Sequence, residues 1–116
     1  MRILSTDVYG GPNRFALFPC VLHVVDLEEL EQWSTTRLGD AFIDGLIRAL
    51  PALADHGCSY GETGGFLRRM REGEGTWLGH VFEHAVLEVQ HLAGHEVTFG
   101  KTRSTKNPGQ YNVVFE

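Results

Sequence analysis

Histidines and a glutamate recur between Gly79 and His91 at a spacing that suits the binding of a metal ion. His80, Glu83 and His84 form the pattern His-x-x-Glu-His. If this stretch is helical, His80 and His84 lie one turn apart on the same face, so both imidazoles can bind one ion. Glu83 then lies beside the second ligand, where a carboxylate can act as general base toward a metal-bound water. The pattern therefore predicts a zinc site, or a site for another divalent metal.

The other polar residues of this stretch support a single reactive face. At about 100° per residue, Glu88 and His91 fall on the same side of the predicted helix as the pattern itself. The opposite side is apolar and holds Val81, Phe82, Ala85, Val86, Val89 and Leu92, with only Leu87 out of place. The order His-x-x-Glu-His is the one in which zinc hydrolases of the inverted type hold their metal. The alternative is an ordinary exposed helix with solvated histidines.

A catalytic zinc site needs a third protein ligand, and Cys58 is the best candidate. It lies in a glycine-rich loop over residues 56–65, which favours exposure. A thiolate, two imidazoles and a water make a reasonable four-coordinate site. Glu88 and His91 are competing ligands, and His56 is a weaker one. The alternative role for Cys58 is that of a small buried hydrophobic residue.

A small basic cluster precedes the histidine stretch. Arg68, Arg69 and Arg71 lie on a short predicted helix. Such a cluster is usually a solvated helix face, but arginine also binds carboxylates through two parallel hydrogen bonds. These three residues are therefore candidate substrate-binding residues.

The composition limits the class of protein. The apolar fraction of 42% is typical of a folded domain, and the net charge of −5 argues against nucleic-acid binding. We expect neither a membrane span nor an export signal, because no run approaches about eighteen apolar residues. Two cysteines without an export signal indicate free thiols, so a cytoplasmic location is expected.

The predicted elements follow the order strand, strand, helices, strand, strand. Strands are expected over Arg2–Tyr9, Phe15–Val25, Glu96–Thr102 and Tyr111–Phe115, and helices over Leu27–Trp33, Asp40–Leu50, Ala52–Asp55, Phe66–Arg71 and Thr76–Ala93. We therefore predict a single α+β domain spanning residues 1–116. Its mainly antiparallel sheet combines two N-terminal and two C-terminal strands, with helices packed on one face.

Four stretches, in order along nearly the whole chain, resemble the N-terminal domain of cyanophycin synthetase. They are Gly11–Asn13, His56–Gly61 together with Gly64–Phe66, Gly75–His84, and Gly109–Phe115. In that family the domain precedes an ATP-grasp ligase domain and a Mur-ligase-like domain. Those domains build a poly-aspartate backbone that carries arginine on each side chain. Both are absent from these residues, so the resemblance indicates an excised domain or a stand-alone relative without ligase activity.

The resemblance implies two roles in cyanophycin metabolism. The domain would bind the growing polymer, and it would act as a metallopeptidase-like hydrolase that cuts cyanophycin into primers. Carried over to this sequence, His80 and His84 would hold zinc and Glu83 would activate water. One alternative is a module that binds the polymer without chemistry, and another is a docking domain for a ligase partner. The Glu72–Gly75 stretch is slightly longer than is usual in the family, which would shift the rim of the site.

Overall fold

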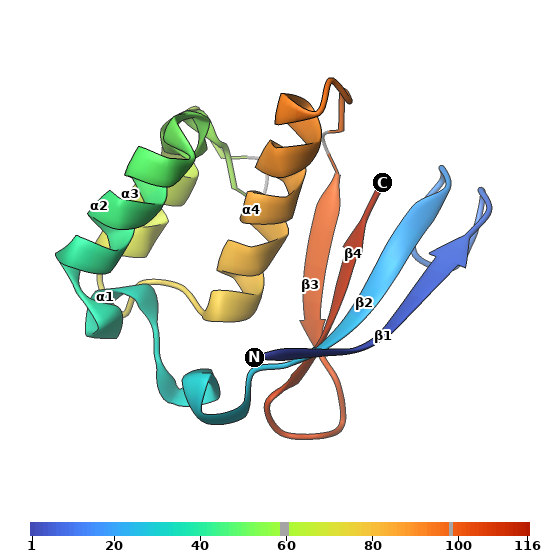
Figure 1. Cartoon of the computed structure of the whole chain (residues 1–116), viewed down its shortest axis with the longest axis horizontal. Coiled ribbons are helices and arrows are strands. Elements are labelled where there is room, and N and C mark those ends of the chain that lie inside the picture. The colour runs from blue at the N-terminus through green and yellow to red at the C-terminus, as the bar shows by residue number, and fades with distance from the viewer. Residues whose placement is uncertain (59–60, 98) are drawn as a thin grey trace.

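Four antiparallel strands form one sheet in the order β1–β2–β4–β3 (Figure 1). Their bounds are Arg2–Tyr9 for β1, Cys20–Asp26 for β2, Gly100–Ser104 for β3 and Gln110–Phe115 for β4. In this computed structural model, residues 1–58, 61–97 and 99–116 are described. The described ranges leave out residues 59 and 60, which belong to a loop that resembles the family, and residue 98, which belongs to an expected strand. The N-terminal and C-terminal strands share one antiparallel sheet, as predicted, and β2–β4 is the pair that joins them.

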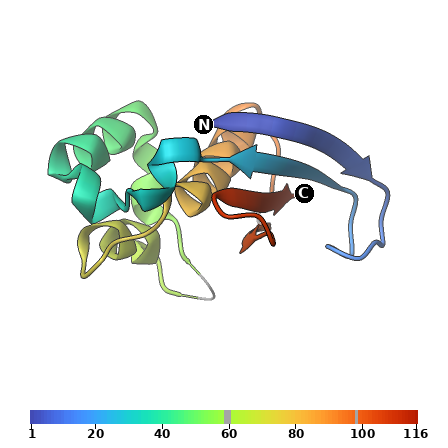
Figure 2. The ribbon, with the colours of Figure 1, turned by 90° about the horizontal axis from the view of Figure 1, so that it is seen from below.

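The helical elements lie together on one side of the sheet (Figures 1 and 2). They are the 3₁₀ helices η1 (Glu28–Gln32) and η2 (Pro51–Asp55) and the α-helices α1 (Thr35–Leu38), α2 (Asp40–Ala49), α3 (Gly65–Arg71) and α4 (Leu78–Leu92). Helix α4 is next to the sheet, and α1, α2 and α3 form a further layer beyond it (Figure 1). The predicted α+β class is confirmed. No helix in the described ranges is long and apolar enough to cross a membrane.

Helix α4 lies between two hydrophobic cores. On the sheet side, Leu87 packs in a cluster with residues of β2 and β4 such as Val25 and Val113. On the helical side, Val81 joins a cluster that includes Phe66 and Met70. The prediction that Leu87 is out of place was wrong, because the sheet supplies a second apolar surface for the helix.

The polar side of α4 also differs from the expectation of an exposed face. Glu83, His84 and Glu88 are buried, whereas Val89 and Leu92 of the predicted apolar side are 55% and 69% exposed. On the helical side, Phe66 of α3 stacks on His84, and His56 at the end of η2 contacts Glu88. Glu83 is covered by β3 instead. Sequence periodicity alone does not reveal which elements cover a helix face. The alternative of an ordinary exposed helix with solvated histidines was therefore wrong.

One buried hydroxyl ties three helices together at the start of α4. The Thr35 hydroxyl, at the beginning of α1, donates to the carbonyl of Met70 in α3 (2.7 Å) and accepts from the backbone N–H of Thr76 (3.0 Å). Gly75, at φ +73°, passes so close that an added Cβ would lie 2.4 Å from the Thr35 hydroxyl oxygen. These contacts fix the position at which α4 begins.

Several element boundaries differ from the prediction. The second strand begins at Cys20 rather than Phe15, because the Asn13 side chain organises the preceding loop. Its amide oxygen accepts from the backbone N–H groups of Phe15 (2.8 Å) and Ala16 (3.0 Å). The helix expected over Leu27–Trp33 is the 3₁₀ helix η1, and β3 begins at Gly100 rather than at residue 96.

Candidate metal centre

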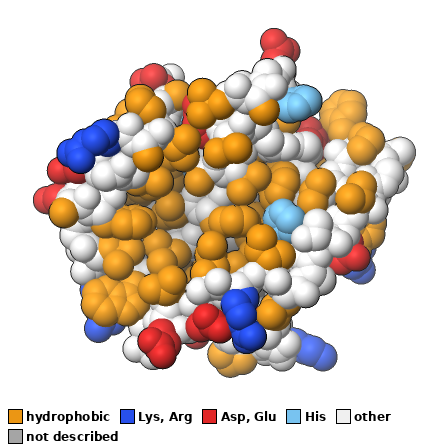
Figure 3. All heavy atoms as spheres, viewed as in Figure 1, with side chains coloured by type: hydrophobic (Ala, Val, Ile, Leu, Met, Phe, Trp, Pro, Cys, Tyr) orange, Lys and Arg blue, Asp and Glu red, His pale blue; other side chains and the backbone are white. Residues whose placement is uncertain are grey.

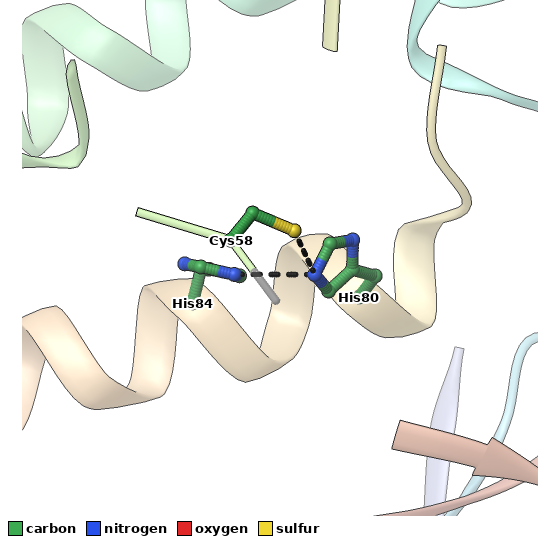
Figure 4. A group of neighbouring side chains, drawn as sticks. All are labelled: Cys58, His80 and His84. Atoms are coloured by element: carbon green, nitrogen blue, oxygen red, sulfur yellow. Dashed lines mark hydrogen bonds between the residues drawn. The ribbon is translucent and has the colours of Figure 1, made fainter. Parts of the chain in front are cut away.

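Two histidines of α4 and one cysteine of the loop after η2 meet at one point. His80 and His84 point from the helix toward Cys58, which approaches from the loop (Figure 4). The two Nε2 atoms are 3.1 Å apart, and the Cys58 Sγ is 3.5 Å from the Nε2 of His80. The ligand atoms of all three residues lie within 4.8 Å of one another. The one-turn spacing of the histidines therefore produces the convergence that the sequence pattern predicts.

These separations are close to those that a zinc ion imposes on its ligands. With Zn–N near 2.0–2.1 Å and Zn–S near 2.3 Å, a tetrahedral site places two nitrogens about 3.3 Å apart and a nitrogen and a sulfur about 3.6 Å apart. The observed distances of 3.1 Å and 3.5 Å differ from these by only a few tenths of an ångström. Two imidazoles and a thiolate are also the donor types that zinc prefers. The donor types and separations of these three side chains are therefore compatible with a zinc ion.

Both histidines are held in the neutral form that a metal requires. Burial, followed by the charge of Arg69, lowers the pKa of His80 to about 4. Burial also lowers the pKa of His84 to about 3, with smaller effects from His80, His56 and Arg69. Neutral imidazole nitrogens can donate a lone pair to a metal without first losing a proton.

The remaining nitrogen of each imidazole has a hydrogen-bond partner. The Nδ1 of His80 is 2.8 Å from the hydroxyl oxygen of Thr76, and the Nδ1 of His84 is 3.0 Å from the Nδ1 of His56. The ring of Phe66 stacks on His84 at a centroid distance of 3.8 Å. Both imidazoles are thus oriented with their Nε2 atoms toward Cys58. Thr76 was not predicted as a site residue, although it lies four residues before His80.

Glu83 lies on the part of α4 that faces β3. The Thr102 hydroxyl donates a short hydrogen bond to the Oε2 of Glu83. Gly100 allows the close approach, because a Cβ at that position would lie 2.7 Å from the Cγ of Glu83. Burial raises the pKa of Glu83, while the Thr102 hydrogen bond and the Arg103 charge oppose the shift. The carboxylate is therefore anchored next to the histidines and disposed to accept a proton.

A cleft of about 980 Å³ runs between the loop after η2, α4 and β3. Its walls include Cys58, His80, Glu83 and His84, so the candidate ligands and the candidate base open into one space. Basic residues also line this cleft, namely Arg69, Lys101 and Arg103. Lys101 and Arg103 were not predicted as site residues, because isolated cations in a short strand carry no distinctive pattern.

The three arginines of the predicted basic cluster have different surroundings. Arg68 forms an ion pair with Glu62, and Arg71 forms ion pairs with Asp40 (3.1 Å) and Asp44 (2.7 Å). Arg69 instead lines the cleft, where a guanidinium nitrogen lies 3.4 Å from the Cys58 Sγ.

The competing third ligands form a second group. Glu88 and His91 lie with His56, with their ligand atoms within 4.8 Å of one another. The His56 Nε2 is 2.9 Å from the Oε2 of Glu88, and the His91 Nδ1 is 3.7 Å from the same oxygen. Cys58 is thus the candidate that the fold brings to His80 and His84.

Comparison with known proteins identifies related sequences. Residues 22–116 match the family described as the cyanophycin synthase-like N-terminal domain. The chain is 47% identical to a cyanophycin synthetase of Synechocystis sp., 46% identical to one of Crocosphaera subtropica and 44% identical to one of Geminocystis herdmanii. Each alignment covers 100% of this chain, which spans only 13% of the length of the relative.

Proposed function

The chain belongs to the family of cyanophycin synthase-like N-terminal domains, and from this membership we propose that it is a zinc-dependent hydrolase that cuts the cyanophycin backbone into primers and also binds the polymer. The observation that supports this proposal most is the convergence of Cys58, His80 and His84 at zinc-like distances. Glu83 opens into the same cleft. The relatives are named as synthetases. That synthetase activity would belong to ATP-grasp and Mur-ligase-like domains, and this domain would act together with them.

In this mechanism each residue has a separate task. Cys58, His80 and His84 would hold the zinc ion. When bound, zinc supplies a Lewis acid that polarises a carbonyl group and lowers the pKa of water to about 7. Glu83 accepts the proton of the attacking water, and the Thr102 hydroxyl, which donates to Oε2, holds the carboxylate in place. The water oxygen bonds to the aspartyl carbonyl carbon, the C–N bond breaks, and Glu83 returns the proton to the leaving nitrogen.

The experiment that tests the proposal combines metal content with polymer cleavage. Protein purified without a histidine tag is expected to contain near-stoichiometric zinc, which His80→Ala and Cys58→Ala lose. Cleavage of purified cyanophycin is followed by chain length and by the appearance of new amino termini. Glu83→Gln is expected to retain zinc and to lose cleavage by at least about a hundredfold, because the amide cannot accept the proton.

A matched control separates chemistry from general damage. Glu62→Gln changes the same functional group in the exposed ion pair with Arg68 and is expected to cleave normally. Cleavage by Glu83→Gln at the wild-type rate would refute the mechanism. Absence of zinc from the wild type, even after zinc is added, would refute the metal site.

Basic residues along the cleft support polymer binding as the second part of the proposal. Lys101 and Arg103 line the main cleft and, with Arg14, a smaller hollow of about 110 Å³. In a chain with a net charge of −5, three cations around one hollow create a local positive potential. Such a surface suits the carboxylates that cyanophycin side groups present.

Charge-neutralising variants test this binding surface. Lys101→Gln and Arg103→Gln are each expected to weaken polymer binding roughly three- to tenfold, with the effect decreasing at high salt. Arg68→Gln is the matched control, because Arg68 is paired with Glu62 and does not line the cleft. Equal binding by all three variants would exclude this surface. Binding without cleavage or metal would favour a non-catalytic polymer-binding domain.

A further inference from the structure

A partly buried chain of hydrogen bonds leads from α4 to His56, at the end of η2, and back to α4. The Oε2 of Glu88 is 2.9 Å from the Nε2 of His56. The Nδ1 of His56 is 3.0 Å from the Nδ1 of His84. The Nε2 of His84 in turn points to the Nε2 of His80 at 3.1 Å. Glu88, His56 and His84 thus form a relay that ends at the candidate metal centre.

The relay determines which nitrogen of each ring carries a proton. A carboxylate can only accept hydrogen bonds, so the Nε2 of His56 donates to Glu88. The Nδ1 of a neutral His56 is then an acceptor, and it must receive its hydrogen from the Nδ1 of His84. With its proton on Nδ1, neutral His84 has a bare lone pair on Nε2. This is the nitrogen that faces His80 and Cys58.

We propose that Glu88 and His56 are positioning residues that fix the tautomer and orientation of His84 so that its Nε2 can bind a metal. The inference rests on the proposed zinc site and deepens it. Histidine ligands commonly donate their second N–H to a carboxylate or carbonyl, which raises their basicity and holds the ring in place. Here the carboxylate acts through an intervening imidazole instead of contacting the ligand directly.

The surroundings of the relay protect its hydrogen bonds from water. The side chains of His56 and Glu88 are 15% and 6% exposed. Phe66 stacks on His84 with an angle of 9° between the ring planes, which prevents the imidazole from turning. His56 and His84 also line the cleft, so this shielding acts on the side of the relay that faces Glu88 and Phe66. The tautomer of each ring depends on its hydrogen-bonded neighbour.

His56, Glu88 and His91 also resemble a second cation site, but that use conflicts with the first. A cation on the Nε2 of His56 would leave the proton of this neutral ring on Nδ1. His56 would then donate to the Nδ1 of His84, and the proton of His84 would move to Nε2. His84 could no longer bind a metal beside His80 and Cys58. The shared Nδ1–Nδ1 contact therefore makes the two sites exclusive, and the relay is the arrangement compatible with the ligand distances around His80.

Two measurements on the intact chain test the relay. Nitrogen-15 NMR of metal-free protein reports the tautomer of each histidine, and competition with a chromophoric chelator reports zinc affinity. Wild-type His84 is expected in the Nδ1–H form. Glu88→Ala is expected to lose this preference and to weaken zinc binding about 10- to 100-fold. Glu88→Gln, whose amide oxygen still accepts from His56, is expected to recover most of the affinity.

His91→Ala is the matched control, because His91 contacts Glu88 but lies outside the relay. It is expected to keep the His84 tautomer and to bind zinc within about threefold of the wild type. If His91→Ala lost as much zinc affinity as Glu88→Ala, the relay would be overturned in favour of a cation site at His56. Wild-type His84 in the Nε2–H form would also overturn it.

The same data separate this inference from the proposed function. If the wild type binds no zinc, the proposed function fails. A His84 tautomer that still depends on Glu88 would then uphold the relay. If zinc binds and the tautomer is the same in wild type and folded Glu88→Ala, the relay fails and the zinc site stands. Circular dichroism establishes that each variant is folded.

Discussion

The two edge strands of the sheet have opposite surroundings. Strand β3 lies beneath α4, where Gly100 and Thr102 contact Glu83. Strand β1 is exposed at seven of its eight residues, including the apolar Ile3, Leu4 and Val8. Figure 2 shows the β1–β2 hairpin extending away from the helices. Helix α4 therefore covers the edge strand β3, whereas the edge strand β1 is left exposed.

This difference indicates where the stability of the domain originates. The two cores on either side of α4 contain most of the fully buried side chains, and the candidate metal centre lies beside them. On the face shown in Figure 3, hydrophobic side chains gather over the helical part of the molecule and charged ones lie mainly around the edge. Substitutions near α4 should therefore be costly, and equivalent changes in β1 or in the loop between β1 and β2 should be mild.

The largest contrast is expected between two phenylalanines. Phe66 is fully buried and stacks on His84, so Phe66→Ala should lower the free energy of unfolding by about 3–5 kcal/mol. Phe18, in the loop of the hairpin, is 64% exposed, and Phe18→Ala should change it by less than about 0.5 kcal/mol. Urea denaturation measures both values. Similar losses of unfolding free energy in the two variants would show that the loop between β1 and β2 contributes to the core.

Two threonines give a smaller contrast through hydrogen bonds. Thr35→Val leaves the carbonyl of Met70 and the N–H of Thr76 without their partner in a buried position, which should cost about 1–3 kcal/mol. The same substitution at Thr6 of β1 removes only an exposed contact with His23 and should cost at most about 0.5 kcal/mol. Thermal unfolding of the pair distinguishes these values. A neutral Thr35→Val would contradict the anchoring role of that hydroxyl.

The smallest effect concerns the ion pairs at the start of β1. The Glu28 carboxylate is 2.8 Å from Arg2 and 3.3 Å from the amino group of Met1. These exposed pairs should contribute about 0.2–1 kcal/mol, so Glu28→Gln should lower stability only slightly. The difference should vanish in about 1 M salt, where screening acts over a few ångströms. A large loss of stability in Glu28→Gln that persists at high salt would mean that β1 is held more firmly than its exposure indicates.

The sequence predicted the candidate site better than its environment. The spacing of His80 and His84 follows from helical geometry alone, and the glycine-rich loop pointed to Cys58. The burial of Glu83 and Glu88 was not predictable, because periodicity shows that a helix face is polar but not which element covers it. The relay through His56 depends on a contact between residues that are far apart in the chain.

The same distinction applies to the fold. The order of strands and helices and the antiparallel sheet followed from local patterns. The boundary of β2 did not, since it depends on how Asn13 bonds the loop before it. Arg69 could not be distinguished from Arg68 and Arg71 by sequence, because their different roles depend on the acids that α2 and the loop place nearby.

The pairing of β2 with β4 has a consequence for how the chain folds during synthesis. Val21 pairs with Phe115, so the centre of the sheet joins residues that are more than ninety positions apart in the sequence. The core that joins Ile43, Leu53, Phe66, Met70 and Val81 needs only a middle segment of the chain. Local contacts form faster than distant ones. We expect this helical core to assemble on the ribosome while the sheet side of α4 stays uncovered until β4 has emerged.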